Sequence, residues 1–324
     1  MAVYTDVSDE ALRDFLADFA IGSLVAFRGI AEGVENSNFQ LRTTQGDFIL
    51  TLYEKRVNAR ELPWFLGLMQ HLAREGVTCP QPVADSQGVT LKTLAGRPAA
   101  ITTFLPGVWP RTVRGEHCRP LGRALAQLHA AGRSYKPERP NALGPAAWTP
   151  LLQSCAGGAD AVQPGLQAEL EQALARIVPA WPGHGANPTL PRGQIHADLF
   201  PDNVFFLNNT VSGLIDFYFA CTDYLAFDVA ICLNAWCFQP DGAFNVTFAR
   251  QMLLGYEEVR KLDDAERRAM PVLAQGAAMR FLLTRLYDWI NTPADALVTP
   301  KNPLDYLKRL RFHLATQSVG GYGL

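Results

Sequence analysis

Apolar and polar residues along the first hundred positions follow patterns that predict a small sheet carrying one inserted helix. Strands are expected over 24–29, 38–43, 48–53, 88–94 and 99–104. A polar turn at 44–47 joins two of them as a hairpin, and an amphipathic helix is expected over 60–74. The sequence Leu105-Pro106-Gly107 then breaks the pattern. We therefore place a domain boundary there and expect an N-terminal lobe over 1–105.

Beyond this boundary the apolar spacing becomes mainly helical. Helices are expected over 116–131, 167–178, 224–238, 246–260, 264–290 and 303–314. The helix over 264–290 is expected to break near Pro271, and the stretch 134–158, rich in Pro, Gly and Ala, is expected to form loop. Short strands over 194–216 interrupt the helices. The whole pattern predicts an α+β fold whose larger C-terminal lobe covers 106–324.

The strand block carries the residues best suited to chemistry. The sequence HADLFPDN covers 196–203, a predicted hairpin follows, and Asp216 stands where the returning strand stops. A hairpin brings its two ends together, so Asp198, Asn203 and Asp216 are expected to converge. Phosphoryl transfer needs one carboxylate to orient and deprotonate the attacking hydroxyl, and other oxygen ligands to hold Mg²⁺. The combination therefore favours a kinase, although each residue alone could simply cap a turn or end a strand.

Composition narrows the choice of partners and of compartment. The 324 residues include 29 basic and 31 acidic side chains, and a net charge of -2 indicates neither a nucleic acid nor a membrane partner. The first residues do not form a signal peptide, and no apolar run approaches the ~20 residues of a membrane span. Six cysteines occur without a Cys-x-x-Cys pair, which is typical of reduced thiols. We therefore expect a cytoplasmic enzyme, and the sequence leaves its oligomeric state open.

The motif HADLFPDN, with GRALAQLH at 122–129, resembles the aminoglycoside phosphotransferase and choline kinase family, whose members have a bilobal protein-kinase-like fold. Within that family the chain is similar to the bacterial homoserine kinases. The segments that carry this second likeness are GVENSNF at 33–39, FILTLYE at 48–54, ELPWFL at 61–66 and LLTRLYD at 282–288. The resemblance implies that Mg-ATP phosphorylates the side-chain hydroxyl of L-homoserine to O-phosphohomoserine, a step of threonine biosynthesis.

The resemblance also implies roles for single residues. Asp198 would be the catalytic base, with Asn203 and Asp216 as magnesium ligands. The remaining positions would bind the nucleotide: Gly33, Asn36, Ser37 and Asn38 over the phosphates, Thr51 and Lys55 on and after the third strand, and backbone groups of Thr103 and Leu105 at the adenine. Kinases of this fold usually carry a cation where this chain has Thr51. Lys55 is the nearest substitute, and it could equally be a solvated lysine at the strand end.

An acceptor with both an ammonium and a carboxylate calls for a fixed acid and a fixed arginine. The candidates for this pocket are Asp223, Tyr224, Arg280 and Arg285, although both arginines could instead form ordinary pairs on a helix surface. Two other residues, His196 and Asp228, are expected to be structural, because a carboxylate in the apolar stretch around 228 needs partners.

Two alternative functions stay open from the sequence. One is a kinase for another small hydroxyl compound, such as choline, ethanolamine, an aminoglycoside or a sugar. The other is a non-catalytic nucleotide-binding protein, which only the missing cation at Thr51 supports.

Overall fold

The computed structural model describes residues 5–30, 36–54, 58–293, 299–316 and 318–323. The chain forms two compact units. Unit 1 consists of Met1–Gly107 with Ser212–Ile215, and unit 2 of Val108–Val211 with Asp216–Leu324. The short segment 212–215 is tied to unit 1 by hydrogen bonds, since the Ser212 hydroxyl donates to Pro106 O at 2.7 Å and Leu214 N donates to Thr78 O at 2.9 Å.

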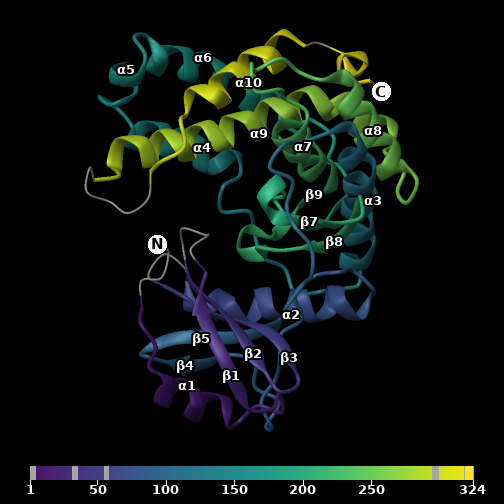
Figure 1. Cartoon of the computed structure of the whole chain (residues 1–324). Helices are drawn as coiled ribbons and strands as arrows, with labels where there is room; N and C mark the ends of the chain where they lie inside the picture. The colour runs from purple at the N-terminus through teal and green to yellow at the C-terminus, as the bar shows by residue number, and fades with distance from the viewer. Residues whose placement is uncertain (1–4, 31–35, 55–57, 294–298, 317, 324) are drawn as a thin grey trace. The chain divides into compact units, whose positions relative to one another are not determined.

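Unit 1 is built on a five-stranded antiparallel sheet with the order β1-β2-β3-β5-β4 (Figure 1). Its strands are β1 (Leu24–Gly29), β2 (Ser37–Thr43), β3 (Gly46–Leu52), β4 (Lys92–Leu94) and β5 (Arg97–Thr103). The strand expected over 88–94 is shorter than predicted, because the Asp85 carboxylate accepts hydrogen bonds from Gln87 N and Val89 N and holds those residues in a turn.

Two helices complete unit 1. In α1 (Asp9–Leu16), the hydroxyl of the N-cap Ser8 accepts a hydrogen bond from Ala11 N at 3.2 Å. Its apolar face shares one core with the sheet, whose buried members include Leu12, Phe15, Leu16, Leu41, Leu50 and Ile101. The second helix, α2 (Leu62–Arg74), stops before Gly76, whose φ of 88° few other residues would adopt.

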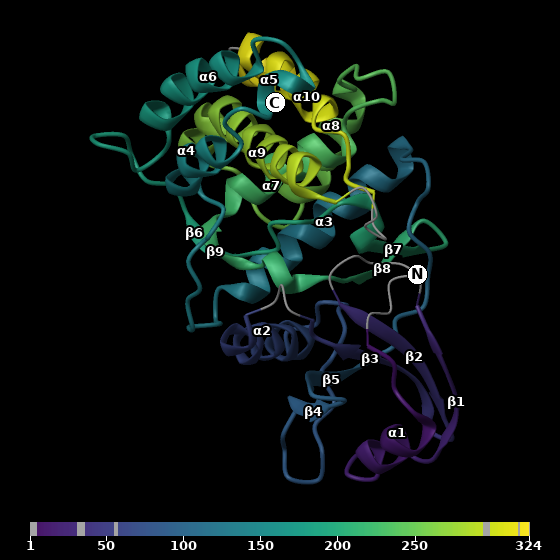
Figure 2. The same cartoon turned by 90° about the vertical axis from the view of Figure 1, so that its left-hand side faces the viewer.

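Unit 2 is mainly helical (Figures 1 and 2). Its helices are α3 (Gly115–Gly132), α4 (Pro145–Ser154), α5 (Ala159–Val162), α6 (Leu166–Ala180), α7 (Leu225–Trp236), α8 (Val246–Glu257), α9 (Asp264–Asn291) and α10 (Leu304–Ala315). The long helix α9 is central, since α4, α6, α7 and α10 all contact it. No helix in the described part of the chain is long and apolar enough to cross a membrane.

Two helical expectations are wrong. The stretch expected to be loop contains α4, because Pro145 can start a helix and Trp148 and Leu152, four residues apart, bury one face of it. Helix α9 is not broken at Pro271. A proline inside a helix removes one hydrogen bond, but the buried neighbours Met270 and Leu273 hold this turn in the core.

Four short strands hold the loops of unit 2 that carry the chemistry-bearing residues. Strand β6 (Arg192–Ile195) pairs antiparallel with β9 (Cys221–Tyr224). Strands β7 (Val204–Leu207) and β8 (Thr210–Leu214) form the predicted hairpin. Its two turn residues, Asn208 and Asn209, have φ of 50° and 59°, the left-handed conformation that a tight two-residue hairpin turn requires and that asparagine tolerates.

Helices α3 and α8 approach each other so closely that only glycine fits at two facing positions. A methyl group on Gly122 of α3 would lie 1.9 Å from Met252 O, and one on Gly255 of α8 would lie 2.0 Å from Arg119 O. Both atoms that would be struck are backbone, so neither can be moved by a change of rotamer. The sequence therefore fixes the α3–α8 distance, and with it the relative positions of side chains on the two helices.

Replacing Gly122 with alanine is expected to lower the free energy of unfolding by about 2 kcal/mol or more, because the two helix backbones must separate. The matched control is Gly115→Ala at the start of the same helix, where the nearest atom is Phe248 Cε1 at 3.4 Å. That variant should be as stable as the parent or slightly more stable. Urea unfolding of both variants measures the difference, and equal stabilities would contradict the close-packing argument.

Candidate active site

The three predicted polar residues meet in unit 2, where two turns bring them together. Asp198 lies in the loop after β6, Asn203 ends the 3-10 turn Pro201–Asn203 just before β7, and Asp216 follows β8. Ala197 and Asp216 have φ of 61° and 64°, a left-handed conformation that is uncommon for residues other than glycine. Such backbone conformations persist where the surrounding structure imposes them, and they are concentrated at functional sites.

Asp198 has the electrostatics of a group in a crowded, poorly hydrated site. Loss of hydration raises the pKa of its carboxyl well above the ordinary value, although the side chain is still partly exposed. The guanidinium of Arg280 opposes this shift, whereas the negative charges of Asp216 and Asp202 add to it. Asp216 therefore lies close enough for its charge to act on Asp198, and the two carboxylates repel each other.

Asn203 is buried and braces the same loop. Its Nδ2 donates to Asp198 O at 2.8 Å and to Asp198 Oδ2 at 3.3 Å. Because the amide nitrogen donates its hydrogen bonds to Asp198, the amide oxygen is the atom of this side chain that could act as a metal ligand.

These residues fit a magnesium ion that is bound together with a nucleotide. Among the described residues, no group of three or more His, Cys, Asp or Glu could hold a metal by itself. Magnesium is commonly held by one or two carboxylates together with substrate phosphates. The carboxylate of Asp216 and the amide oxygen of Asn203 would supply such oxygen ligands, and a cation beside them would relieve the repulsion between Asp198 and Asp216.

Asp228 at the start of α7 anchors the backbone directly before Asp198. Its fully buried carboxylate accepts hydrogen bonds from His196 N at 2.7 Å and Ala197 N at 2.9 Å. Burial alone would raise the pKa of Asp228, but the hydrogen bonds from the His129 ring and from the His196 backbone help to outweigh burial, and the pKa is lowered. The anion therefore holds the strained residue Ala197, directly before Asp198.

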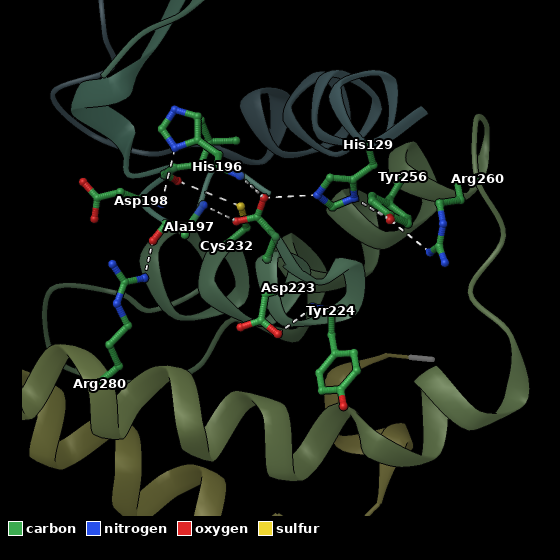
Figure 3. Close-up of polar contacts among 12 residues, drawn as sticks. His129, His196, Ala197, Asp198, Asp223, Tyr224, Cys232, Tyr256, Arg260 and Arg280 are labelled. Atoms are coloured by element: carbon green, nitrogen blue, oxygen red, sulfur yellow. Dashed lines mark hydrogen bonds and ion pairs between the residues drawn. The ribbon is translucent and has the colours of Figure 1, made fainter. Parts of the chain in front are cut away.

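A chain of polar side chains continues from Asp228 through His129, Tyr256 and Arg260, the last three of which Figure 3 labels. His129 Nε2 lies 3.1 Å from Asp228 Oδ2, and His129 Nδ1 lies 2.8 Å from Tyr256 Oη. Arg260 Nη1 donates to Tyr256 Oη at 3.1 Å, and Arg260 Nη2 donates to Glu266 at 2.7 Å. Because the Asp228 carboxylate can only accept a hydrogen bond, the proton of a neutral His129 belongs on Nε2, and Nδ1 then accepts the hydroxyl proton of Tyr256.

His196 itself supports the loop with its ring. Its Nδ1 accepts a hydrogen bond from Asp198 N at 3.3 Å, and its imidazole packs on Phe217, the residue after Asp216, with ring centroids 4.7 Å apart. One buried side chain thus contacts the segments that carry both carboxylates.

Two of the acceptor candidates have buried structural partners. Arg280 Nη1 donates to Ala197 O, and its guanidinium lies over the Phe281 ring, 4.4 Å from the centroid. Tyr224 donates its hydroxyl proton to Pro182 O at 3.0 Å. Each side chain therefore uses a polar group for a hydrogen bond within the protein.

The other two acceptor candidates are Asp223 and Arg285. Asp223 accepts from Asn141 Nδ2 and from Tyr224 N, each at 2.7 Å, and burial raises the pKa of Asp223. Arg285 makes a long bond of 3.4 Å to Asn302 O.

The candidates for nucleotide binding in unit 1 are partly joined to one another. The Thr51 hydroxyl donates to Asn38 Oδ1 at 2.8 Å across the β2–β3 pair, so the place of the usual cation is filled by a neutral hydrogen bond. Asn36 Oδ1 accepts from Glu54 N, and the Ser37 hydroxyl donates to Glu54 Oε1 at 2.7 Å.

The segment expected at the adenine is also in unit 1. Thr103 N donates to Gln81 O at 3.0 Å, and Leu105 packs under Gly213, where an added methyl group would lie 2.7 Å from Leu105 Cδ1. Two further residues of the nucleotide set, Gly33 and Lys55, lie outside the described residues.

Sequence reasoning gave no role to several residues that the structure places around the site. His129 was noted only as part of a family motif, although a lone histidine on an otherwise apolar helix face is a signal for a buried polar partner. Tyr256 and Glu266 are fully buried polar residues of the same kind. Tyr306 on α10 is fully buried as well, and nothing in its local sequence shows that it faces the charged groups of the loop.

Comparison with known proteins identifies relatives that match over the whole chain. The model of the phosphotransferase enzyme family matches residues 26–262. The homoserine kinase of Gluconacetobacter diazotrophicus is 68% identical and that of Acidiphilium cryptum 63% identical, each over 324 residues that cover all of both chains.

Solved structures show the same fold at low identity. An amicoumacin kinase in complex with AMP-PNP and Ca²⁺ matches with a TM-score of 0.68 and 16% identity, over 95% of this chain and 94% of its own. The choline kinase of Cryptosporidium parvum matches with a TM-score of 0.65 and 12% identity, over the same shares. These likenesses confirm the predicted protein-kinase-like fold. The chain therefore belongs to the phosphotransferase enzyme family and is a small-molecule kinase.

Proposed function

We propose that this kinase transfers the γ-phosphoryl group of ATP to the side-chain hydroxyl of L-homoserine, with Mg²⁺ as the metal. The observation that carries the choice of acceptor is the full-length likeness to homoserine kinases at 68% and 63% identity. The grouping of Asp198, Asn203 and Asp216 in one loop system supports phosphoryl transfer itself. The product would be O-phosphohomoserine, which places the reaction in threonine biosynthesis.

Each residue of the site has a definite task in this proposal. Asp198 orients the acceptor hydroxyl and takes its proton as the oxygen forms its bond to phosphorus. Asn203, through its amide oxygen, and Asp216 hold the magnesium ion. Bound Mg-ATP supplies the phosphoryl group and neutralises charge on the phosphates. Asp228 and His196 act only on the backbone of the loop, and so they are positioning residues.

The nucleotide is assigned to unit 1. The proposed contacts are the glycine-containing loop with Gly33, the polar residues Asn36, Ser37 and Asn38, Thr51 and Lys55, and backbone groups at Thr103 and Leu105. The carbonyl of Thr103 is the better candidate for adenine, because its N–H already bonds to Gln81 O.

The acceptor is assigned to unit 2. Arg285, whose one described hydrogen bond is long, is the natural partner for a substrate carboxylate. Asp223 is the proposed partner for the ammonium group. Arg280 and Tyr224 would shape the pocket, because each already has a buried structural partner.

Turnover of a panel of hydroxyl compounds tests the acceptor. We expect kcat/KM for L-homoserine to exceed that for choline and kanamycin by about 100-fold or more, since a site built for a carboxylate rejects compounds that lack it. Release of ADP with L-homoserine, L-serine, L-threonine, choline, methylthioribose and kanamycin in turn provides the measurement. Turnover confined to choline or kanamycin would remove the homoserine assignment.

The Asp198→Asn variant is expected to lose about 100- to 10,000-fold in kcat with a normal fold, because it can no longer accept the proton. The matched control is Asp202→Asn in the same loop, whose exposed side chain only pairs with Lys301 at 3.8 Å. That change should alter kcat by no more than about fivefold. Steady-state rates and circular dichroism are measured for both, and an active Asp198→Asn protein would reject this residue as the base.

The Asp216→Asn variant is expected to need at least about tenfold more free Mg²⁺ for half its maximal rate, because one anionic ligand becomes neutral. The rise in thermal midpoint on adding Mg-ADP should shrink in parallel, which gives a readout independent of turnover. An unchanged magnesium dependence would show that Asp216 is not a ligand.

A further inference from the structure

Tyr306 on α10 presents an unusual buried group. The side chain is fully buried, and among the described residues its hydroxyl oxygen has no hydrogen bond of standard geometry, although the Arg309 guanidinium lies close enough to interact with it. Folded proteins rarely keep such a hydroxyl inside, and each exception calls for an explanation. Burial raises the pKa of Tyr306, against the opposing effect of nearby arginines, so the group remains a neutral O–H donor.

Two arginines surround the Tyr306 ring. The guanidinium carbon of Arg309, one turn along α10, lies 4.4 Å from the ring centroid, and that of Arg285 on α9 lies 4.5 Å from it. The two helices lie side by side (Figure 1). Burial lowers the pKa of Arg285, and the positive charge of Arg309 lowers it further. The cations therefore repel each other across an aromatic ring, and an anion bound there would relieve both.

This cluster lies beside the catalytic loop. Phe200, two residues after Asp198, packs edge-on against Phe281 with centroids 4.9 Å apart, and Phe281 packs on Tyr306 at 5.4 Å. The charge of Asp198 reaches both Tyr306 and Arg285. Arg280 adds a second buried polar atom without a partner, its Nε. Donors without well-formed hydrogen bonds and two guanidiniums thus lie near Asp198, the residue proposed to receive the acceptor hydroxyl, together with the carboxylate of Asp305.

We propose that the Tyr306 hydroxyl, flanked by Arg285 and Arg309, binds the carboxylate of the acceptor and is the group that selects an amino acid over an amino alcohol. This inference rests on the proposed function and names the residues that decide its specificity. The phenol donates one hydrogen bond, and the guanidiniums supply charge. A polycationic acceptor would be repelled by the same cluster.

The test compares L-homoserine with 3-aminopropan-1-ol, which is homoserine without its carboxylate. Tyr306→Phe keeps the ring between the arginines and removes only the hydroxyl. We expect kcat/KM for L-homoserine to fall roughly 10- to 100-fold, mainly through KM, because a hydrogen bond to a charged group is lost. The value for 3-aminopropan-1-ol and the KM for ATP should change less than about twofold. Tyr287→Phe, an exposed tyrosine on α9, is the control and should change neither.

Thermal unfolding separates recognition from a structural role. Because the Tyr306 hydroxyl has no hydrogen bond of standard geometry within the described residues, its removal should leave the thermal midpoint unchanged or raise it. A lower midpoint with equal losses for both acceptors would make Tyr306 structural and overturn the inference. A rise in the KM for ATP alone would assign the cluster to a nucleotide phosphate and also overturn it.

The wild-type protein distinguishes this inference from the proposed function. A wild type that does not turn over L-homoserine would overturn the proposed function and this inference with it. Equal use of L-homoserine and 3-aminopropan-1-ol by the wild type would overturn this inference alone. The role of Tyr306 alone would be overturned if the wild type prefers L-homoserine over 3-aminopropan-1-ol and the Tyr306→Phe variant shows the same ratio of kcat/KM values.

Discussion

The buried carboxylate of Asp228 is the constraint on which the catalytic loop depends. It accepts hydrogen bonds from two successive backbone N–H groups, those of His196 and Ala197, and it fixes Ala197 in a left-handed conformation. An anion without solvent is stable only when such donors surround it. This backbone geometry sets the direction of the Asp198 side chain. Asp228, which acts only on the backbone of the loop, therefore determines where the proposed base points.

The anchor is itself held by packing that begins far away in the sequence. Asp228 bonds to His129 of α3, and His129 bonds to Tyr256 of α8. These two side chains can meet only because α3 and α8 pack backbone to backbone at Gly122 and Gly255. A glycine pair with no chemistry of its own therefore sets the separation on which a chain of buried hydrogen bonds relies. Fold and site are linked through this one helix contact.

The sequence predicts the local parts of this arrangement well and its long-range parts poorly. Strand alternation and the Asn208-Asn209 turn were enough to predict the sheet and the hairpin, because both are set by neighbouring residues. The continuous helix through Pro271 could not be predicted, since the packing that overrides the proline comes from residues distant in the chain. The buried polar contacts of His129 and Tyr306 could not be predicted for the same reason. Each has an ordinary helical neighbourhood, and only the tertiary contact shows that a polar atom is buried.

Loop positioning and the proposed acceptor recognition depend largely on different side chains, and this division has a physical consequence. The Asp228 anchor draws on α3, α7 and α8, and Arg280 of α9 adds a bond to Ala197 O, so that a single change here leaves a buried polar group unpaired. Arg285 of α9 and Tyr306 of α10 make few bonds within the fold, whereas Arg309 donates to Asn234 O at 2.6 Å. Side chains of the second kind can change without unfolding the first. Solved proteins that share this fold at 12–16% identity are named as kinases of amicoumacin and of choline. Such a spread of acceptors is expected if the chemistry of phosphoryl transfer is fixed by the buried anchor and the choice of acceptor is left to the helices beside it.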